Sequence, residues 1–202
     1  MKKFGVVLKH TGMLAIIYFL IPGYAFAQPQ SNTINPNGYN RFYYANGKLS
    51  SEGTMVNGKP DGFWRTYYET GKIKSEGNRK NQQLDSLWKF YNDSGQLTSA
   101  YIYKAGKKNG VQTEFYSNGN IKSEEFLEDN IKNGLSKYYN SEGKMNRSVL
   151  FSNGVENGIA REYDPADGRI ITVTTYKNGY FTKEEKIISK LFIISRHKYG
   201  LG

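Results

Sequence analysis

The sequence repeats itself at a fixed interval of 24 residues, and this repetition limits the possible folds more than any other feature. The segment YYANGKLSSEG, which begins at Tyr43, returns as YYETGKIKSEG, which begins at Tyr67. Six units align, with first residues Gly38, Gly62, Ser86, Gly110, Gly134 and Gly158, and the sixth carries one extra residue. A repeat of this length indicates a stacked architecture in which each unit covers the apolar surface of its neighbour.

Several positions of the repeat keep one type of side chain in all six units. The residue after the unit start is always apolar: Tyr39, Phe63, Leu87, Val111, Leu135 and Ile159. Four residues later the side chain is always aromatic: Tyr43, Tyr67, Tyr91, Phe115, Tyr139 and Tyr163. A glycine follows, and two residues beyond it stands Leu49, Ile73, Leu97, Ile121, Met145 or Ile170. The aromatic and aliphatic runs on either side of the glycine are typical of a β-hairpin.

The hairpin loop is expected to hold three residues. A two-residue type I′ turn would need a positive φ at Thr70, Ser94 and Glu142, whereas a type I turn closed by a left-handed glycine needs it only of the glycine. This register places Tyr43 opposite Leu49, and the same pairing recurs in the later units. Short second turns such as NGKPDG, at 57–62, leave no room for crossover helices. The sequence therefore predicts an all-β fold, an open antiparallel meander of six stacked hairpins over residues 38–181.

The segments GFWRTYYETGKIKSEG (62–77) and GVQTEFYSNGNIKSEE (110–125) resemble MORN repeats, in the variant found in exported and antitoxin-like bacterial proteins. The resemblance covers 38–181, and it departs from the pattern where Asn40, Gln112, Ser136 and Ala160 replace tryptophan. The resemblance implies an elongated hairpin sheet used as an interaction platform, sometimes near membranes. It implies no enzymatic activity.

The two ends of the chain differ from the repeats. Residues 1–27 combine early lysines, the apolar run MLAIIYFLI, a Pro-Gly break and AFA, which predicts a cleaved signal peptide. The run is too short to span a bilayer as a helix, and the absence of cysteine excludes a lipid anchor. We therefore expect a periplasmic or extracellular protein, with a flexible linker at residues 28–37.

At the C-terminal end, residues 182–202 are expected to form a cap or tail. The sequence TKEEKIISKLFIISRHK places apolar residues mostly on one helical face, and Thr182 with Glu185 fits a capping box. The main expectation is a short amphipathic helix that covers the last hairpin, because an open sheet edge invites pairing with other chains. A membrane-surface helix and a β-strand remain as alternatives.

The sequence offers little for catalysis. The expected mature chain has one histidine, His197, and no cysteine, so we expect no enzyme activity, no metal site, no cofactor and no small-molecule substrate. Glu52, Glu76 and Glu124 recur at one repeat position, and we interpret them as a solvated ladder rather than as paired catalytic acids.

Candidate binding residues lie at other repeat positions. A basic column, interrupted by Thr113, could contact a protein partner or a membrane surface; nucleic acid is not expected for an exported protein. The alternative is that these side chains pack over tyrosine rings and stabilise the sheet. The opposite face offers two tryptophans and a tyrosine. The candidates are Arg41, Arg65, Lys89, Lys137 and Arg161 in the column, with Trp64, Tyr68 and Trp88 on the other face.

These observations predict an exported, non-catalytic interaction platform that binds an unknown protein partner. Two other functions fit the same sequence. One is an antitoxin-like or immunity protein that neutralises a specific toxic partner, and the other is peripheral binding to a membrane or its lipid headgroups.

Overall fold

A computed structural model describes residues 33–187, and these residues form one antiparallel β-sheet with no helix among them. The expected signal peptide and the first five residues of the expected linker lie outside the described residues. The strands are β1 (Tyr39–Tyr43), β2 (Leu49–Val56), β3 (Lys59–Tyr67), β4 (Ile73–Lys80), β5 (Gln83–Tyr91), β6 (Leu97–Lys104), β7 (Lys107–Phe115), β8 (Ile121–Glu128), β9 (Ile131–Lys132), β10 (Gly134–Tyr139), β11 (Met145–Ser152), β12 (Val155–Tyr163), β13 (Ile170–Lys177) and β14 (Tyr180–Lys186).

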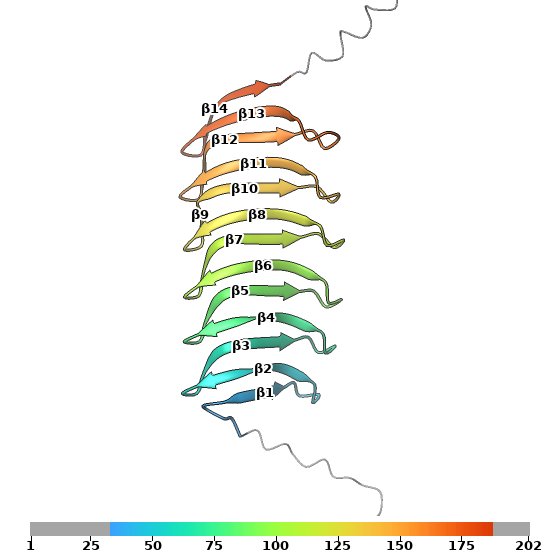
Figure 1. The fold of residues 1–202 in the computed structure, drawn as a ribbon, viewed down its shortest axis with the longest axis vertical. Helices are drawn as coiled ribbons and strands as arrows, with labels where there is room; N and C mark the ends of the chain where they lie inside the picture. Colours follow the sequence, from blue (N-terminus) through green and yellow to red (C-terminus); the bar gives the residue numbers. More distant parts are fainter. Residues whose placement is uncertain (1–32, 188–202) are drawn as a thin grey trace, which may run out of the picture. The chain divides into compact units, whose positions relative to one another are not determined.

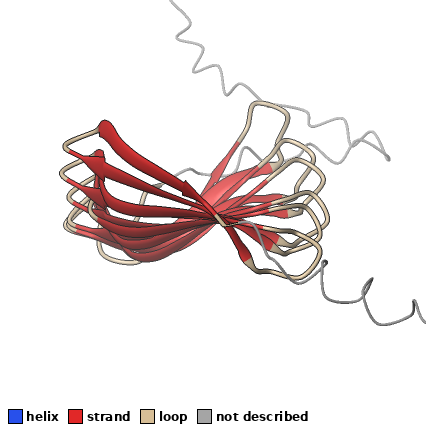
Figure 2. Cartoon of the chain, turned by 90° about the horizontal axis from the view of Figure 1, so that it is seen from above, coloured by secondary structure: helices blue, strands red, loops and turns tan. Residues whose placement is uncertain are grey.

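The strands stack in the order in which they occur in the sequence, so every connection is a hairpin (Figure 1). Strands β9 and β10 flank Asn133 and both pair with β8. Seen along the stack, the strands fan out with the usual twist of a sheet (Figure 2). The predicted open meander of hairpins is confirmed.

The first five hairpin loops have the predicted three residues, and the sixth, at 165–168, has four. In the second unit, the amide of Tyr68 donates to the carbonyl of Lys72 at 2.8 Å and the amide of Gly71 donates to the carbonyl of Tyr68 at 2.8 Å. Gly71 has a φ of 89°, which a side chain would make costly. Tyr67 lies opposite Ile73, as the sequence register required.

The turns between hairpins are of a second kind. Asn57 and Gly58 both have positive φ, as a two-residue type I′ turn requires, and every later connection between hairpins repeats this geometry. The amide of Gly58 also donates to the carbonyl of Pro36 at 2.8 Å, and equivalent bonds tie each later turn to the preceding unit. Residues at the end of the expected linker therefore contact the first hairpin.

A bulge near the start of each unit explains the glycine found there. In β3, Pro60 pairs with Met55 and Trp64 pairs with Gly53, so three residues around Gly62 oppose one residue of β2. Gly62 has a φ of 86°, and the equivalent glycines of later units are also left-handed. In the third unit the position holds Ser86, with a φ of 59°. After the bulge, successive side chains alternate between the two faces of the sheet.

The buried core lies on one face, which we call the indole face. Its apolar cluster consists of Met55, Trp64 and Trp88, with Phe42, Leu84, Phe90 and Tyr103 packed against it. Trp64 lies opposite Gly53 and Trp88 lies opposite Gly77. A Cβ atom on either glycine would lie within 2.7 Å of the indole ring, so the missing side chain makes room for the tryptophan.

Later units fill the same paired positions differently. Where Trp88 faces Gly77, the equivalent pairs are Gln112 with Tyr101 and Ala160 with Val149. A large residue in one strand thus accompanies a smaller one in the other, as close packing requires.

The C-terminal expectation needs a correction. Residues Tyr180–Lys186 form β14, which pairs with β13, so no helix begins at Thr182 and the capping box does not form. The edge of β13 offers residues 180–186 a row of backbone hydrogen bonds, which a short helix would have to form by itself. The remainder of the expected cap, from residue 188 onward, lies outside the described residues.

Candidate binding face

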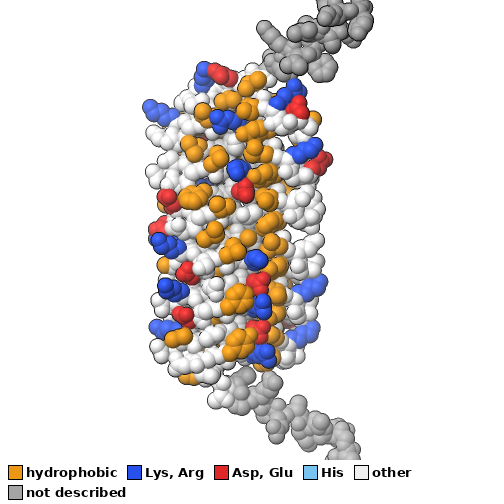
Figure 3. Space-filling view, viewed as in Figure 1, with side chains coloured by type: hydrophobic (Ala, Val, Ile, Leu, Met, Phe, Trp, Pro, Cys, Tyr) orange, Lys and Arg blue, Asp and Glu red, His pale blue; other side chains and the backbone are white. Residues whose placement is uncertain are grey.

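The face opposite the indoles carries three columns of side chains, and we call it the ladder face. The tyrosine column (Tyr43, Tyr67, Tyr91, Phe115, Tyr139 and Tyr163) runs near the three-residue loops. The basic column runs along the middle. The apolar residues that follow each unit start run near the type I′ turns. Figure 3 shows this face, where blue and red side chains meet between two columns of orange.

The basic column is paired with the recurring glutamates. The Nε atom of Arg41 lies 3.2 Å from Glu52, that of Arg65 lies 3.0 Å from Glu76, and the amino group of Lys137 lies 3.5 Å from Glu124. These residues face each other across adjacent strands. From the sequence, we treat the glutamates and the basic residues as separate columns, because the hairpin register is used there only to pair the aromatic and aliphatic residues.

The tyrosine column donates to the same carboxylates. Tyr91 donates its hydroxyl to Glu76 at 2.8 Å, and Tyr139 donates to Glu124 at 2.8 Å. Burial and the glutamate partner raise the pKa of both hydroxyls to about 12. Burial opposes ionisation of Glu76, but the hydrogen bonds from Arg65 and Tyr91 outweigh it and lower the pKa of that carboxyl. The carboxylates thus link the first hairpin to the second, the second to the third, and the fourth to the fifth.

One member of the basic column, Arg161, has no glutamate opposite it. Lys89 lies between Glu76 and Ala100 of the two adjacent strands, whereas Arg161 faces Ser148 and Val173. The expected packing over aromatic rings is seen for Arg65, whose guanidinium lies 5.0 Å from the ring centre of Phe63. The column therefore combines cations that face a glutamate with a single one, Arg161, that lacks a directly opposed carboxylate.

The candidates on the other face have structural contacts. Trp88 is 2% exposed and donates its indole N–H to the carbonyl of Asn78, and Trp64 is similarly buried and bonded. Tyr68 donates to the carbonyl of Tyr91 at 2.7 Å and so links two units. The two tryptophans offer almost no surface to a partner.

The apolar column was not selected as a site from the sequence. Its six members are all exposed, from 40% for Ile159 to 56% for Tyr39. Directly opposite lie Ile102 beside Leu87, Phe126 beside Val111 and Leu150 beside Leu135. We call the combined row the apolar stripe: Tyr39, Phe63, Leu87, Ile102, Val111, Phe126, Leu135, Leu150 and Ile159. The signal was present in the sequence, as a position that stays apolar in every unit.

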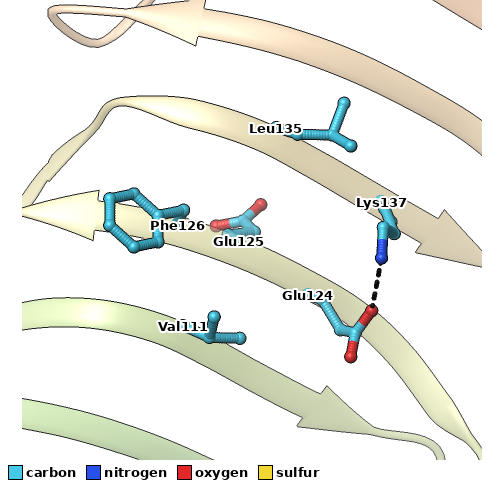
Figure 4. A pocket seen from close by; sticks show the side chains of 6 residues that line it. All are labelled: Val111, Glu124, Glu125, Phe126, Leu135 and Lys137. Atoms are coloured by element: carbon cyan, nitrogen blue, oxygen red, sulfur yellow. Dashed lines mark ion pairs between the residues drawn. The ribbon is translucent and has the colours of Figure 1, made fainter.

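A hollow of about 290 Å³ marks the middle of the stripe. Val111, Phe126 and Leu135 line it, and the Glu124–Lys137 ion pair forms its border (Figure 4). Glu125 also borders the hollow, and its carboxylate accepts a hydrogen bond from Tyr138 at 2.8 Å. The hollow combines apolar walls with charged groups at one side, which is the usual composition of a binding site.

A comparison with known families agrees with this architecture. A family described as a MORN repeat variant matches residues 36–57, 60–81 and 108–129. The matched segments begin 24 and 48 residues apart, which is the interval between the hairpins and twice that interval. The chain contains MORN repeats. No curated protein sequence matches this chain.

The hairpins between and beyond the matched MORN repeats share their register, from β5 to β13. MORN repeats suggest a role in binding, and the family is generally non-catalytic. Among residues 33–187, no three acidic or histidine side chains converge as a metal site would require. Within that same range, no helix is present that could cross a membrane. The ladder face of the repeats is thus the main candidate for function.

Proposed function

We propose that this protein is an exported, non-enzymatic platform that binds a protein partner through the ladder face of its MORN repeats. The observation that carries this proposal is the apolar stripe. A contiguous exposed apolar row is unusual on a soluble monomer, and such rows mark interaction surfaces. Export is supported by the composition of residues 1–27, and a partner in the envelope or outside the cell follows from it.

The architecture supports binding better than catalysis. Residues 33–187 form a single-layer sheet whose faces are open to solvent, whereas an enzyme usually shields its reaction from water in a closed site. The repeated columns instead offer many similar contacts in a row, as extended binding surfaces of repeat proteins do.

Site-specific photo-crosslinking tests the proposal. A photoreactive amino acid replaces Leu135 on the stripe, and the matched control replaces Glu162, which is exposed on the indole face. In the cells that produce the protein, we expect a crosslinked protein partner from position 135 and none from position 162. Equal crosslinking from both positions, or none from the stripe, contradicts the proposal.

An antitoxin-like role would use the same face, and it would predict that the crosslinked partner is toxic when produced without this protein. Binding to lipid headgroups would instead give crosslinks to lipid from position 135.

A further inference from the structure

The sheet is open, so each of its two outermost strands has one edge that no strand of residues 33–187 covers (Figure 1). The last strand, β14, carries four charged side chains, all of them exposed: Lys183, Glu184, Glu185 and Lys186. Charges of this kind keep a sheet edge from pairing with another chain. The first strand, β1, has a single charged residue, Arg41, and Glu52 already pairs with it at 3.2 Å. The edge of β1 therefore lacks the protection that β14 has.

The backbone of β1 carries hydrogen-bonding groups on this outer edge. The amide of Met55 in β2 donates to the carbonyl of Gly38 at 2.9 Å. Because successive residues of an antiparallel strand direct their backbone groups to opposite sides, residues 38, 40 and 42 face β2. The amide and carbonyl groups of Arg41 and Tyr43 therefore point away from β2, where no strand of the described range pairs with them.

The later units show what covers the same edge elsewhere in the sheet. Arg65 in β3 stands at the repeat position of Arg41, and it lies between Glu52 of the preceding strand and Glu76 of the following one. Arg41 has Glu52 on its inner side, and no described strand lies on its outer side. Its side chain is accordingly 61% exposed, compared with 43% for Arg65. The outer side of Arg41 thus lacks the carboxylate that Arg65 has.

Tyr43 lacks partners in the same way. In the second unit, the hydroxyl of Tyr67 donates to Glu52 of the preceding strand, and the carbonyl of Tyr67 accepts a hydrogen bond from the hydroxyl of Tyr44. Among residues 33–187, the hydroxyl of Tyr43 has no hydrogen-bond partner, and the side chain is exposed. One more strand with the pattern of β2 would supply the missing carboxylate.

From these observations we infer that the free edge of β1 binds an extended segment of a partner protein as an additional antiparallel strand, with a glutamate opposite Arg41. The backbone of the segment pairs with that of Arg41 and Tyr43, and its carboxylate accepts the hydroxyl of Tyr43. Strand addition is a common mode of peptide recognition, in which backbone bonds give affinity and alternate side chains give specificity. The inference goes beyond the proposed function, because it concerns the edge of the sheet rather than the ladder face.

Two other occupants fit this edge less well. The preceding part of this chain would have to turn back at Thr33 and Ile34, which stand where Asn57 and Gly58 form the next type I′ turn. That turn needs a positive φ at both residues, which β-branched side chains resist. A second copy stacked end to end would bring its β14 against β1 as a parallel strand, because both strands run in the same direction. A copy paired through its own β1 has no acid on that strand to set against Arg41.

A synthetic peptide tests the added strand directly. The probe has the sequence of residues 47–56, GKLSSEGTMV, which contains β2 and pairs with β3 in the required way. Its glutamate should face Arg41 as Glu52 faces Arg65 in the sheet. NMR follows the amide signals of the isotope-labelled protein as the cells export it. We expect the amide signals of Arg41 and Tyr43 to shift and their hydrogen exchange to slow, while the signals of β14 stay unchanged.

Two methylated peptides distinguish backbone pairing from attraction between side chains. In the sheet, the backbone groups of Gly53 face β1 and those of Glu52 face β3, so the amide of the peptide's glutamate should donate to the edge of β1. N-methylation of that glutamate should abolish binding. N-methylation of the next glycine, whose amide points away from the edge, should leave binding largely intact.

Side-chain substitutions test the choice of glutamate. A peptide with Glu52→Gln should bind at least about threefold more weakly than the original. In the protein variant Arg41→Gln with Tyr43→Phe, the two peptides should bind equally. Circular dichroism and the thermal midpoint show that this variant is folded.

Several results would overturn the inference. These are no binding of the unmodified peptide, equal binding of the two methylated peptides, or slow hydrogen exchange at Arg41 and Tyr43 before any peptide is added. Slow exchange in the free protein would mean that the chain itself or a second copy already covers the edge, and sedimentation velocity tells these two apart. Crosslinking from position 135 on the stripe does not depend on the edge, so failure here leaves the proposed function standing.

Discussion

The contact between Gly77 and Trp88 allows the packing argument to be tested quantitatively. A Cβ atom at position 77 would lie 2.5 Å from two indole carbons and 2.7 Å from a third. Carbon atoms in contact prefer about 3.5–4.0 Å, so Gly77→Ala forces the ring to withdraw by about 1 Å. Trp88 is buried and its N–H donates at 2.6 Å to Asn78, so the ring has little room to move.

The expected magnitude follows from two opposing effects. Overpacking of this kind costs about 1–3 kcal/mol, and a weakened hydrogen bond adds about 1 kcal/mol. Because the φ of Gly77 is not in the left-handed region, alanine should also lower the conformational entropy of the unfolded chain. This effect stabilises the folded state by about 0.4–1 kcal/mol and offsets part of the loss. We therefore expect Gly77→Ala to lower the free energy of unfolding by about 1–3 kcal/mol, which corresponds to about 2–12 °C in the thermal midpoint.

The assay is urea unfolding followed by tryptophan fluorescence. Trp64 and Trp88 are the two tryptophans of the chain, so the emission reports on the second and third units. The matched control is Asn78→Ala, on the same strand but with its side chain on the exposed face, and it should change stability by no more than about 0.5 kcal/mol. Unchanged stability and emission in Gly77→Ala would refute the reasoning.

A double variant tests the exchange of volume between strands. Gly77→Val with Trp88→Ala copies the Val149–Ala160 pair found later in the sheet. Trp88→Ala alone should cost about 3–5 kcal/mol because it leaves a cavity. The double variant should be more stable than the sum of the single effects predicts, by about 1–3 kcal/mol. Additive effects would mean that the two positions do not share one packing volume.

Four further predictions concern the turns, the polar network and the N-terminus. Ser86→Gly should raise stability by up to about 1 kcal/mol in urea unfolding, because the serine holds a left-handed φ of 59°; Ser94→Gly, in an ordinary turn conformation, should not. Gly71→Ala should lose about 1–2 kcal/mol while Thr70→Ala changes little, and equal thermal midpoints would contradict the left-handed loop. Because the pKa of Tyr67, Tyr91 and Tyr139 is raised to about 12, their contribution to stability is complete below pH 10 and should be lost between pH 10 and pH 12, less steeply in Tyr91→Phe. Intact-mass measurement of the exported protein should give a chain that begins at Gln28, and a mass that retains 1–27 would exclude cleavage.

Local rules were enough to predict the hairpins. The glycine of each three-residue loop fixes its own φ, and loop length then fixes which residues face each other, so Tyr67 and Ile73 could be paired from the sequence. Loop length does not fix the contacts between strands of neighbouring hairpins in the same way. The ion pair between Lys137 and Glu124 depends on this second register, which bulges shift. Even so, one relation between hairpins was visible in the repeats. Where the side chain at the position of Trp88 becomes small, as in Ala160, the side chain at the position of Gly77 becomes larger, as in Val149.

In the C-terminal segment, local sequence rules were not enough to predict the structure. Its apolar spacing and the capping pair at Thr182 and Glu185 favour a helix when read alone. The structure pairs residues 180–186 with β13, because the ladder supplies backbone partners that a short helix would have to form by itself. Pairing with a neighbouring strand therefore determined the structure of residues 180–186, although the local sequence pattern favours a helix.

The two faces of the sheet vary in opposite senses, and this contrast is the strongest argument for where function lies. At the buried position of the repeat, the six residues are Asn40, Trp64, Trp88, Gln112, Ser136 and Ala160, and the packing adapts to each of them. At the neighbouring exposed position, every residue is apolar, although a polar side chain would be well hydrated there. Packing alone would give the reverse, with a constant core and a variable surface. The stripe stays apolar in a place where folding does not demand it, so a partner that removes it from water accounts for its composition.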